Sequence, residues 1–147
     1  MKIIIISPGK AKNYLGEDIV LEYTSRVSHY SSIEWKFISS SDIQEESQKI
    51  LKIIPEASYV VLLDERGKGF SSIEFSDFLE KRLGDSTKNL IFIVGGAYGI
   101  DESVRSRANY IWSLSSLVFP HELVRSILAE QIYRGFSIIK GEKYHHE

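Results

Sequence analysis

Short segments rich in β-branched residues alternate with longer amphipathic segments, and this alternation constrains the fold more than any other feature of the chain. The short apolar runs predict strands at residues 2–7, 33–39, 59–64, 89–94 and 110–115. Apolar residues that recur every three or four positions predict helices at about 12–29, 42–55, from Ser71, at about 101–108 and from Pro120. Such alternation favours a parallel sheet with helices on both faces. We therefore predict one α/β domain, a parallel-sheet sandwich that spans residues 1–147.

Helix-capping residues support several of these boundaries. Asp42 fits an N-cap, and Ser71 with Glu74 fits a capping box. Pro120 fits the first position of a helix, where its missing N–H costs nothing. The predicted helix starts therefore rest on local chemistry as well as on periodicity.

Composition excludes several classes of protein. The chain has no cysteine, which excludes disulfides and thiolate metal sites and fits a reducing cytoplasm. No apolar run approaches the roughly 18 residues of a membrane span, and the run at 2–7 is too short for a secretory signal. The formal net charge of −2 argues against a free-standing nucleic-acid binder but leaves RNA open as a partner. We expect a soluble cytoplasmic protein that does not enter a membrane.

Segments that follow the predicted strands carry the features of a ligand pocket. They read LLDERGKG at 62–69, VGGAYG at 94–99 and LSSLVFPH at 114–121. Ligands of parallel sheets bind beyond the carboxyl ends of the strands, and glycine lets the backbone approach a ligand closely. Each of the first two segments alone also fits an ordinary tight turn. Together they predict a pocket at one edge of the sheet.

The familiar cofactor and catalytic signatures do not fit these segments. The GKG sequence at 67–69 lacks the Ser or Thr of a phosphate loop. The glycines after 89–94 come too late for a dinucleotide fingerprint, and no GxSxG elbow occurs. The HE pair at 121–122 begins like a zinc-binding HExxH, but Arg125 stands where the second histidine belongs. We expect no metal.

Longer motifs resemble one bacterial family. LDERGK..SS.EF, FIVGGAYG and WSLSSLVFPHELVRSILAEQIYR...I..GEKYHH resemble the SPOUT methyltransferases that act on a pseudouridine of large-subunit ribosomal RNA. The KIIIIS.GK start also matches, so the resemblance covers essentially the whole chain. This sequence departs at Gly135, where the family usually has alanine and where glycine is expected to loosen the end of the last helix. It also adds Glu147 after the histidines.

The resemblance implies a fold, a reaction and a cofactor site. The fold is a parallel α/β sheet whose C-terminal part forms a trefoil knot, and the family works as a homodimer. The reaction is S-adenosylmethionine-dependent methylation at N3 of a pseudouridine in 23S rRNA, with the assembled ribosome as the expected substrate. The residues implied in cofactor binding are Leu63, Gly95, Leu114, Ser115, Ser116, Leu117, Val118 and Phe119.

The end of the chain supplies the candidate catalytic residues. A base must remove the N3 proton, and His145 or His146 suits this by chemistry. Tyr144 can stack on a nucleobase, and Arg134 can stabilise negative charge on it, grip a phosphate, or merely complement the helix dipole. Arg125 can also grip a phosphate. The tail is alternatively a disordered terminus, or a segment that completes the site of a partner subunit.

Other interpretations stay open at this point. His121, in the first turn of its helix, is expected to be neutral, either as a hydrogen-bond partner of the cofactor segment or as a structural residue. The protein can also be a SPOUT-like methyltransferase of another RNA such as tRNA. A third interpretation is a dimer that binds RNA or a nucleotide without catalysis.

Overall fold

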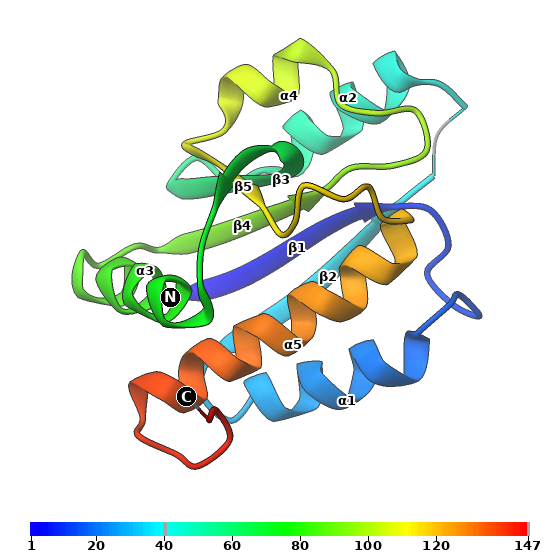
Figure 1. Cartoon of the computed structure of the whole chain (residues 1–147). Helices are drawn as coiled ribbons and strands as arrows, with labels where there is room; N and C mark the ends of the chain where they lie inside the picture. Colours follow the sequence, from blue (N-terminus) through cyan, green and yellow to red (C-terminus); the bar gives the residue numbers. More distant parts are fainter. Residues whose placement is uncertain (40, 147) are drawn as a thin grey trace.

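The protein is built on a parallel sheet that runs through the middle of the molecule (Figure 1). The computed structural model describes residues 1–39 and 41–146, so Glu147 lies outside the described residues. The strand order is β2-β1-β4-β3-β5, and every pairing is parallel. The strands are β1 (Lys2–Pro8), β2 (Ser32–Ile38), β3 (Ser58–Gly69), β4 (Asn89–Val94) and β5 (Tyr110–Ser113).

Helices cover both faces of the sheet, as the alternation of segments predicts. Two of them, α2 (Ile43–Ile53) and α4 (Glu102–Arg107), lie on one face. The other face carries α1 (Glu17–Val27), α3 (Ser72–Gly84) and α5 (His121–Ile139), with α5 between its two neighbours (Figure 1). None of the helices in residues 1–39 and 41–146 is long and apolar enough to cross a membrane.

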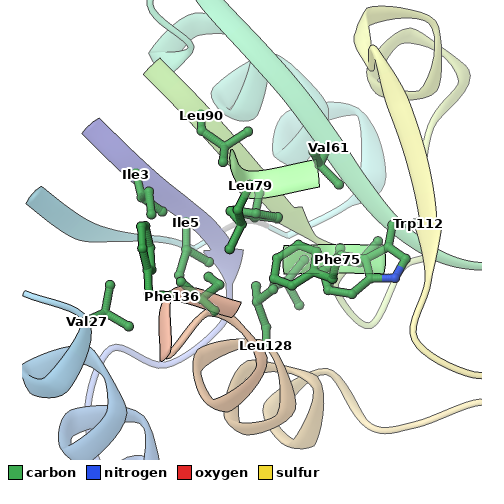
Figure 2. Packing of buried hydrophobic residues seen from close by; sticks show 14 residues of the cluster. Ile3, Ile5, Val27, Val61, Phe75, Leu79, Leu90, Trp112, Leu128 and Phe136 are labelled. Carbon is green, nitrogen blue, oxygen red and sulfur yellow. The ribbon is translucent and has the colours of Figure 1, made fainter. Parts of the chain in front are cut away.

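Each face of the sheet has its own core, because successive side chains of a strand point to opposite faces. On β1, Ile3 and Ile5 join the core under α1, α3 and α5, whereas Ile4 and Ile6 join the core under α2 and α4. Figure 2 shows the larger core, where the rings of Phe75 and Trp112 stack with centroids 4.4 Å apart. Burial of each such side chain contributes roughly 1.5–3 kcal/mol.

Gly135 lies inside α5, which continues to Ile139, so the expected loosening of the helix end is wrong. A Cβ at position 135 would lie 2.6 Å from Leu79 Cδ1 and 3.4 Å from Phe75 Cδ2. The missing side chain therefore lets α3 pack closely against α5.

The predicted caps are confirmed in the structure, with one shift. Asp42 accepts a hydrogen bond from the backbone N–H of Glu45 at 2.8 Å, and Ser71 with Glu74 forms the capping box. Pro120 is the N-cap of α5 rather than its first helical residue. Caps depend on neighbours in sequence, which explains why local chemistry locates them within about one residue.

The structure corrects the bounds of some other elements. The helix expected from residue 12 begins at Glu17, because Asn13 (φ 56°) and Gly16 (φ 82°) adopt left-handed conformations that a helix does not continue. Strand β3 extends through most of the segment expected as a loop and pairs with β5 again at Lys68 after an irregularity. The first of the three expected loops is therefore largely strand.

Candidate active site

A cleft of about 260 Å³ lies at the carboxyl edge of the sheet. Its walls come from the segments after Leu63 on β3, after Val94 on β4 and after β5, together with the start of α5. All of the implied cofactor residues except Ser116 line it, namely Leu63, Gly95, Leu114, Ser115, Leu117, Val118 and Phe119. We call this space the edge cleft.

A tight glycine turn forms one wall of the edge cleft. The N–H of Gly99 donates to the carbonyl of Gly96 at 3.2 Å, and the positive φ of Gly99 (86°) suits glycine. A Cβ at Gly95 would lie 3.2 Å from Cγ1 of Ile100, so a larger side chain there has to displace Ile100 or enter the cleft. Glycine at 95 therefore keeps the wall open.

The segment after β5 forms the opposite wall and is ordered by its own serines. Ser113 Oγ donates to the Ser115 carbonyl at 2.8 Å, and the N–H of Leu117 donates to Ser115 Oγ at 3.0 Å. These bonds hold the loop in a conformation that leaves Leu117 and Val118 67% and 78% exposed. Exposed apolar side chains beside a cleft mark a surface suited to a ligand or a partner.

Sequence reasoning did not single out Asp64, the buried carboxylate in the wall of the edge cleft. Arg105 Nη2 lies 2.6 Å and Arg66 Nε 3.6 Å from its Oδ2. Burial alone would raise the pKa of Asp64, but the hydrogen bonds from Arg105 and the Arg66 backbone outweigh it and lower the pKa. The signal in the sequence was an acid directly after a buried apolar strand. Asp64 is thus an ion-paired anion at the cleft.

His121 lines the edge cleft at the start of α5. Burial lowers the pKa of His121, and the charge of Arg125 lowers it further. Both effects favour the neutral imidazole, and burial rather than the helix dipole is the largest cause.

Arg125 is fully buried, so the idea that it grips a phosphate is wrong. Its Nε donates to Ser7 Oγ at 2.7 Å, and its two terminal nitrogens donate to the carbonyls of Pro8 and Lys10 at 2.8 Å. The guanidinium also lies over the ring of Tyr14, with Cζ 4.4 Å from the ring centroid. Arg125 therefore ties the segment after β1 to α5.

The candidate catalytic residues at the chain end form a second cluster. Arg134 Nη2 lies 2.6 Å from Glu130 Oε2, and Arg134 Nη1 donates to Nδ1 of His145 at 3.0 Å. Tyr144 lies under the Arg134 guanidinium, and its hydroxyl donates to Glu130 Oε2 at 2.7 Å. We call Glu130, Arg134, Tyr144 and His145 the tail cluster.

The tail cluster is ordered by further contacts with its own chain. Tyr23 on α1 donates to the Tyr144 hydroxyl at 3.0 Å. The rings of Tyr133 and Tyr144 meet edge to face with centroids 4.7 Å apart. Burial raises the pKa of Tyr144, and the hydrogen bonds with Tyr23 and Glu130 raise it further. These contacts argue against a disordered terminus at Tyr144.

One chain does not bring the edge cleft and the tail cluster together. His121 stands at one end of α5, and Arg134 follows roughly 20 Å further along the helix at about 1.5 Å per residue. Figure 1 shows the C-terminal segment at the far end of α5 from the segment that follows β5. The two predicted groups of site residues therefore occupy opposite ends of one helix.

Comparison with known proteins identifies the class. A family model described as "Predicted SPOUT methyltransferase" matches residues 1–145. The chain belongs to the SPOUT methyltransferase family, which confirms the resemblance seen in the sequence. Membership implies a methyl-donor cofactor, and a cleft with a glycine turn and apolar walls suits one. No group of three or more His, Cys, Asp or Glu in residues 1–39 and 41–146 could hold a metal ion.

Individual relatives carry one name, Ribosomal RNA large subunit methyltransferase H. The protein of Christiangramia forsetii is 39% identical over 99% of this chain and 99% of the relative. That of Geotalea daltonii is 39% identical over 99% of this chain and 100% of the relative. That of Caldicellulosiruptor saccharolyticus is 38% identical over 97% of this chain and 99% of the relative.

Proposed function

We propose that this protein is an S-adenosylmethionine-dependent methyltransferase that methylates N3 of a pseudouridine in 23S rRNA, in the cytoplasm and on the assembled ribosome. The observation that carries the proposal is the edge cleft, which three segments close at the carboxyl edge of the sheet. The names of the full-length relatives support rRNA as the substrate.

The cofactor would be held by the walls of the edge cleft. Leu63, Ile100 and Leu114 offer apolar surface to an adenine ring. Gly95 and the loop at 114–119 offer close backbone approach for its polar atoms. When bound, S-adenosylmethionine supplies an electrophilic methyl group, and the enzyme chiefly has to align the nucleophile with it.

A homodimer would complete the site. Leu15 and Ile19, before and on α1, are 64% and 44% exposed, and Leu123 on α5 is 38% exposed. The N–H of Leu15 donates to Glu122 at 3.1 Å, so these apolar residues lie together at the cleft end of α1 and α5. A twofold axis that crosses α5 between this patch and Arg134 would run the two α5 helices in opposite directions and bring each tail towards the partner's edge cleft.

The tail cluster then supplies the chemistry of proton removal. Arg134 stabilises the negative charge that develops on the nucleobase, and Tyr144 stacks on or hydrogen-bonds to the base. One of the tail imidazoles takes the proton from N3. Nδ1 of His145 accepts a hydrogen bond from Arg134, and this bond has to break before Nδ1 can take the proton. His146 is exposed.

We also propose that the C-terminal part of the chain is threaded into a trefoil knot. The support is that β5 lies at the edge of the sheet beyond β3, while α5 returns to lie between α1 and α3. Stretching single molecules after unfolding tests this. A knotted chain keeps a tightened knot and reaches a shorter contour length than the same chain untied.

The decisive experiment is nucleoside mass spectrometry of RNA from cells with and without the gene. Loss of N3-methylpseudouridine from 23S rRNA in the deletion strain is the expected result. Loss of a methylated nucleoside from tRNA instead would show that the substrate is tRNA. A protein that gives no heat with S-adenosylmethionine in calorimetry would be a binding module.

The form of the substrate is tested with purified components. A domain of formal net charge −2 has little general affinity for isolated RNA, because phosphate neutralisation supplies most non-specific binding. We expect methylation of assembled ribosomes and little activity on protein-free 23S rRNA. Equal rates on both would show that RNA alone is recognised.

A further inference from the structure

A second cavity of about 230 Å³ adjoins the edge cleft. It lies over the ends of β1 and β2, and Glu46, Tyr98 and the end of β1 contribute to its walls. Ala97 and His121 line both spaces. The cavity and the edge cleft therefore share a wall and lie side by side at the carboxyl edge of the sheet.

Glu46 gives this cavity an unusual chemistry. Its side chain is buried, with 2% exposure, and its Oε2 has no hydrogen-bond partner within residues 1–39 and 41–146. The other oxygen, Oε1, lies so close to Gly96 that a Cβ at that position would clash with it. A buried polar atom without a partner costs free energy. An unpaired carboxyl beside a ligand cleft is therefore explained better by a ligand than by folding.

The neighbouring residue shows that this burial is specific. Glu45, one position earlier on α2, is only half-buried, accepts a hydrogen bond from Ser41 and pairs with Lys49 at 3.0 Å. Burial raises the pKa of Glu46, which favours the neutral acid. A neutral carboxyl can donate an O–H hydrogen bond to a carbonyl oxygen.

We propose that this cavity receives the target nucleobase, with Glu46 donating a hydrogen bond to a ring carbonyl beside the nitrogen that is methylated. The proposal rests on the proposed function and adds the substrate site to it. The ligand class is a pyrimidine ring whose reactive nitrogen lies between two carbonyl groups. Tyr98, 51% exposed at the wall of the cavity, offers an aromatic face on which such a ring stacks.

The position of Glu46 suits the charge that the reaction develops. As N3 loses its proton to a tail imidazole, negative charge spreads onto the flanking carbonyl oxygens, where the O–H of Glu46 stabilises it. N3 forms a bond to the methyl carbon as the carbon–sulfur bond breaks, and the sulfonium becomes a neutral thioether. In its neutral form, which burial favours, Glu46 takes no part in the proton transfer and acts by electrostatic stabilisation.

The test compares Glu46→Leu, Glu46→Gln and the matched control Glu45→Gln in methylation of assembled ribosomes, with cofactor affinity measured by calorimetry. Glu46→Leu removes the donor, so we expect kcat/KM to fall by about 100-fold with cofactor affinity within about 3-fold. The amide of Glu46→Gln still donates, so its loss should stay within about 10-fold. Glu45→Gln should match the wild type.

A second variant keeps the test open if Glu46→Leu does not fold. Tyr98→Ala removes an exposed aromatic ring and should raise KM for ribosomes by about 10-fold, whereas Tyr98→Phe should retain the wild-type KM. A wild-type enzyme inactive on ribosomes would refute the proposed function itself. If the wild type is active, undiminished activity of Glu46→Leu overturns the inference. If Glu46→Leu is unfolded, undiminished activity of Tyr98→Ala overturns it instead. Equal loss of cofactor affinity and activity in Glu46→Leu would also overturn it, because Glu46 would then only shape the glycine turn.

Discussion

Helix α5 carries one arginine near each end, and the two differ in almost everything except their type. Arg125 is fully buried and donates to Ser7 and to the carbonyls of Pro8 and Lys10. Arg134 remains partly exposed, pairs with Glu130 at 2.6 Å and contacts His145. The nitrogens of the first are taken up by one serine hydroxyl and two backbone carbonyls, whereas the second lies among ionisable and aromatic side chains.

The comparison shows how surroundings assign a role to a residue type. An arginine whose nitrogens are all used by buried acceptors stabilises the fold and has nothing left for a ligand. An arginine at the surface, held beside a histidine and a tyrosine, can exchange its contacts for those of a substrate. Substitutions at the cleft end of α5 are therefore expected to reduce cofactor binding or stability. Substitutions at the tail end are expected to reduce turnover.

Deleting residues 144–147 should produce the largest effect. Without Tyr144 and the histidines, turnover should fall by about 1,000-fold or more, because the stacking group and the base are removed together. Cofactor affinity should stay within about 3-fold, since the edge cleft is built from other segments. Single-turnover methylation and calorimetry measure the two quantities. A fully active truncated homodimer would contradict the different roles of the two ends of α5. The tail would then have only a structural role.

Mixed dimers sharpen this prediction. A truncated chain paired with a Gly95→Val chain has one site with an intact cleft from the first and an intact tail from the second. Recovered activity, after subunit exchange is confirmed, is expected if the tail serves the partner. No recovery would mean that each tail serves its own chain.

Gly95→Val should have the next largest effect, at the cleft end. The branched side chain presses on Ile100 or fills the edge cleft, since even a Cβ lies 3.2 Å from Ile100 Cγ1. Cofactor affinity should fall by about 100-fold or more, while the circular dichroism spectrum stays that of the wild type. Undiminished cofactor binding by this variant would show that Gly95 is not part of the cofactor site.

Arg125→Met and Arg134→Met test the two arginines directly by urea unfolding. Arg125→Met leaves three acceptors, two of them buried, without their donor and should lower the free energy of unfolding by about 3 kcal/mol. Arg134→Met breaks a partly exposed pair and should cost less than about 1 kcal/mol, yet it should reduce turnover. Equal destabilisation by both variants would contradict the different roles assigned to them.

The smallest expected effect is a pH dependence at Glu46. Its folded-state pKa is raised above the ordinary 4.5, so its ionisation destabilises the folded state as pH rises from the ordinary pKa to the raised one. Glu46→Gln does not titrate and should gain stability relative to the wild type as pH rises through that window. Parallel stability curves for the two proteins above the ordinary pKa of 4.5 would show that Glu46 ionises freely in the folded protein.

The strands, the capped helices and the approximate cleft segments could be predicted because they depend on residues close in sequence. The continuous apolar run of β1, buried on both faces, and the capping box of Ser71 and Glu74 are of this kind. The late start of α1 and the extension of β3 could not be predicted, since they depend on left-handed residues and on pairing with β5. Asp64 and Glu46 were missed because their burial depends on packing: the adjacent acids, Glu65 and Glu45, are exposed and half-buried.

The sequence by itself determined the alternation of strands and helices and the membership of the family, since both follow from patterns along the chain. Only the tertiary structure decided that Arg125 is buried while Arg134 meets Tyr144 and His145, and that Glu46 lies beside the glycine turn. The physical reason is that burial and partners depend on contacts between residues distant in sequence. Such contacts form when the whole chain packs, and no local pattern encodes them.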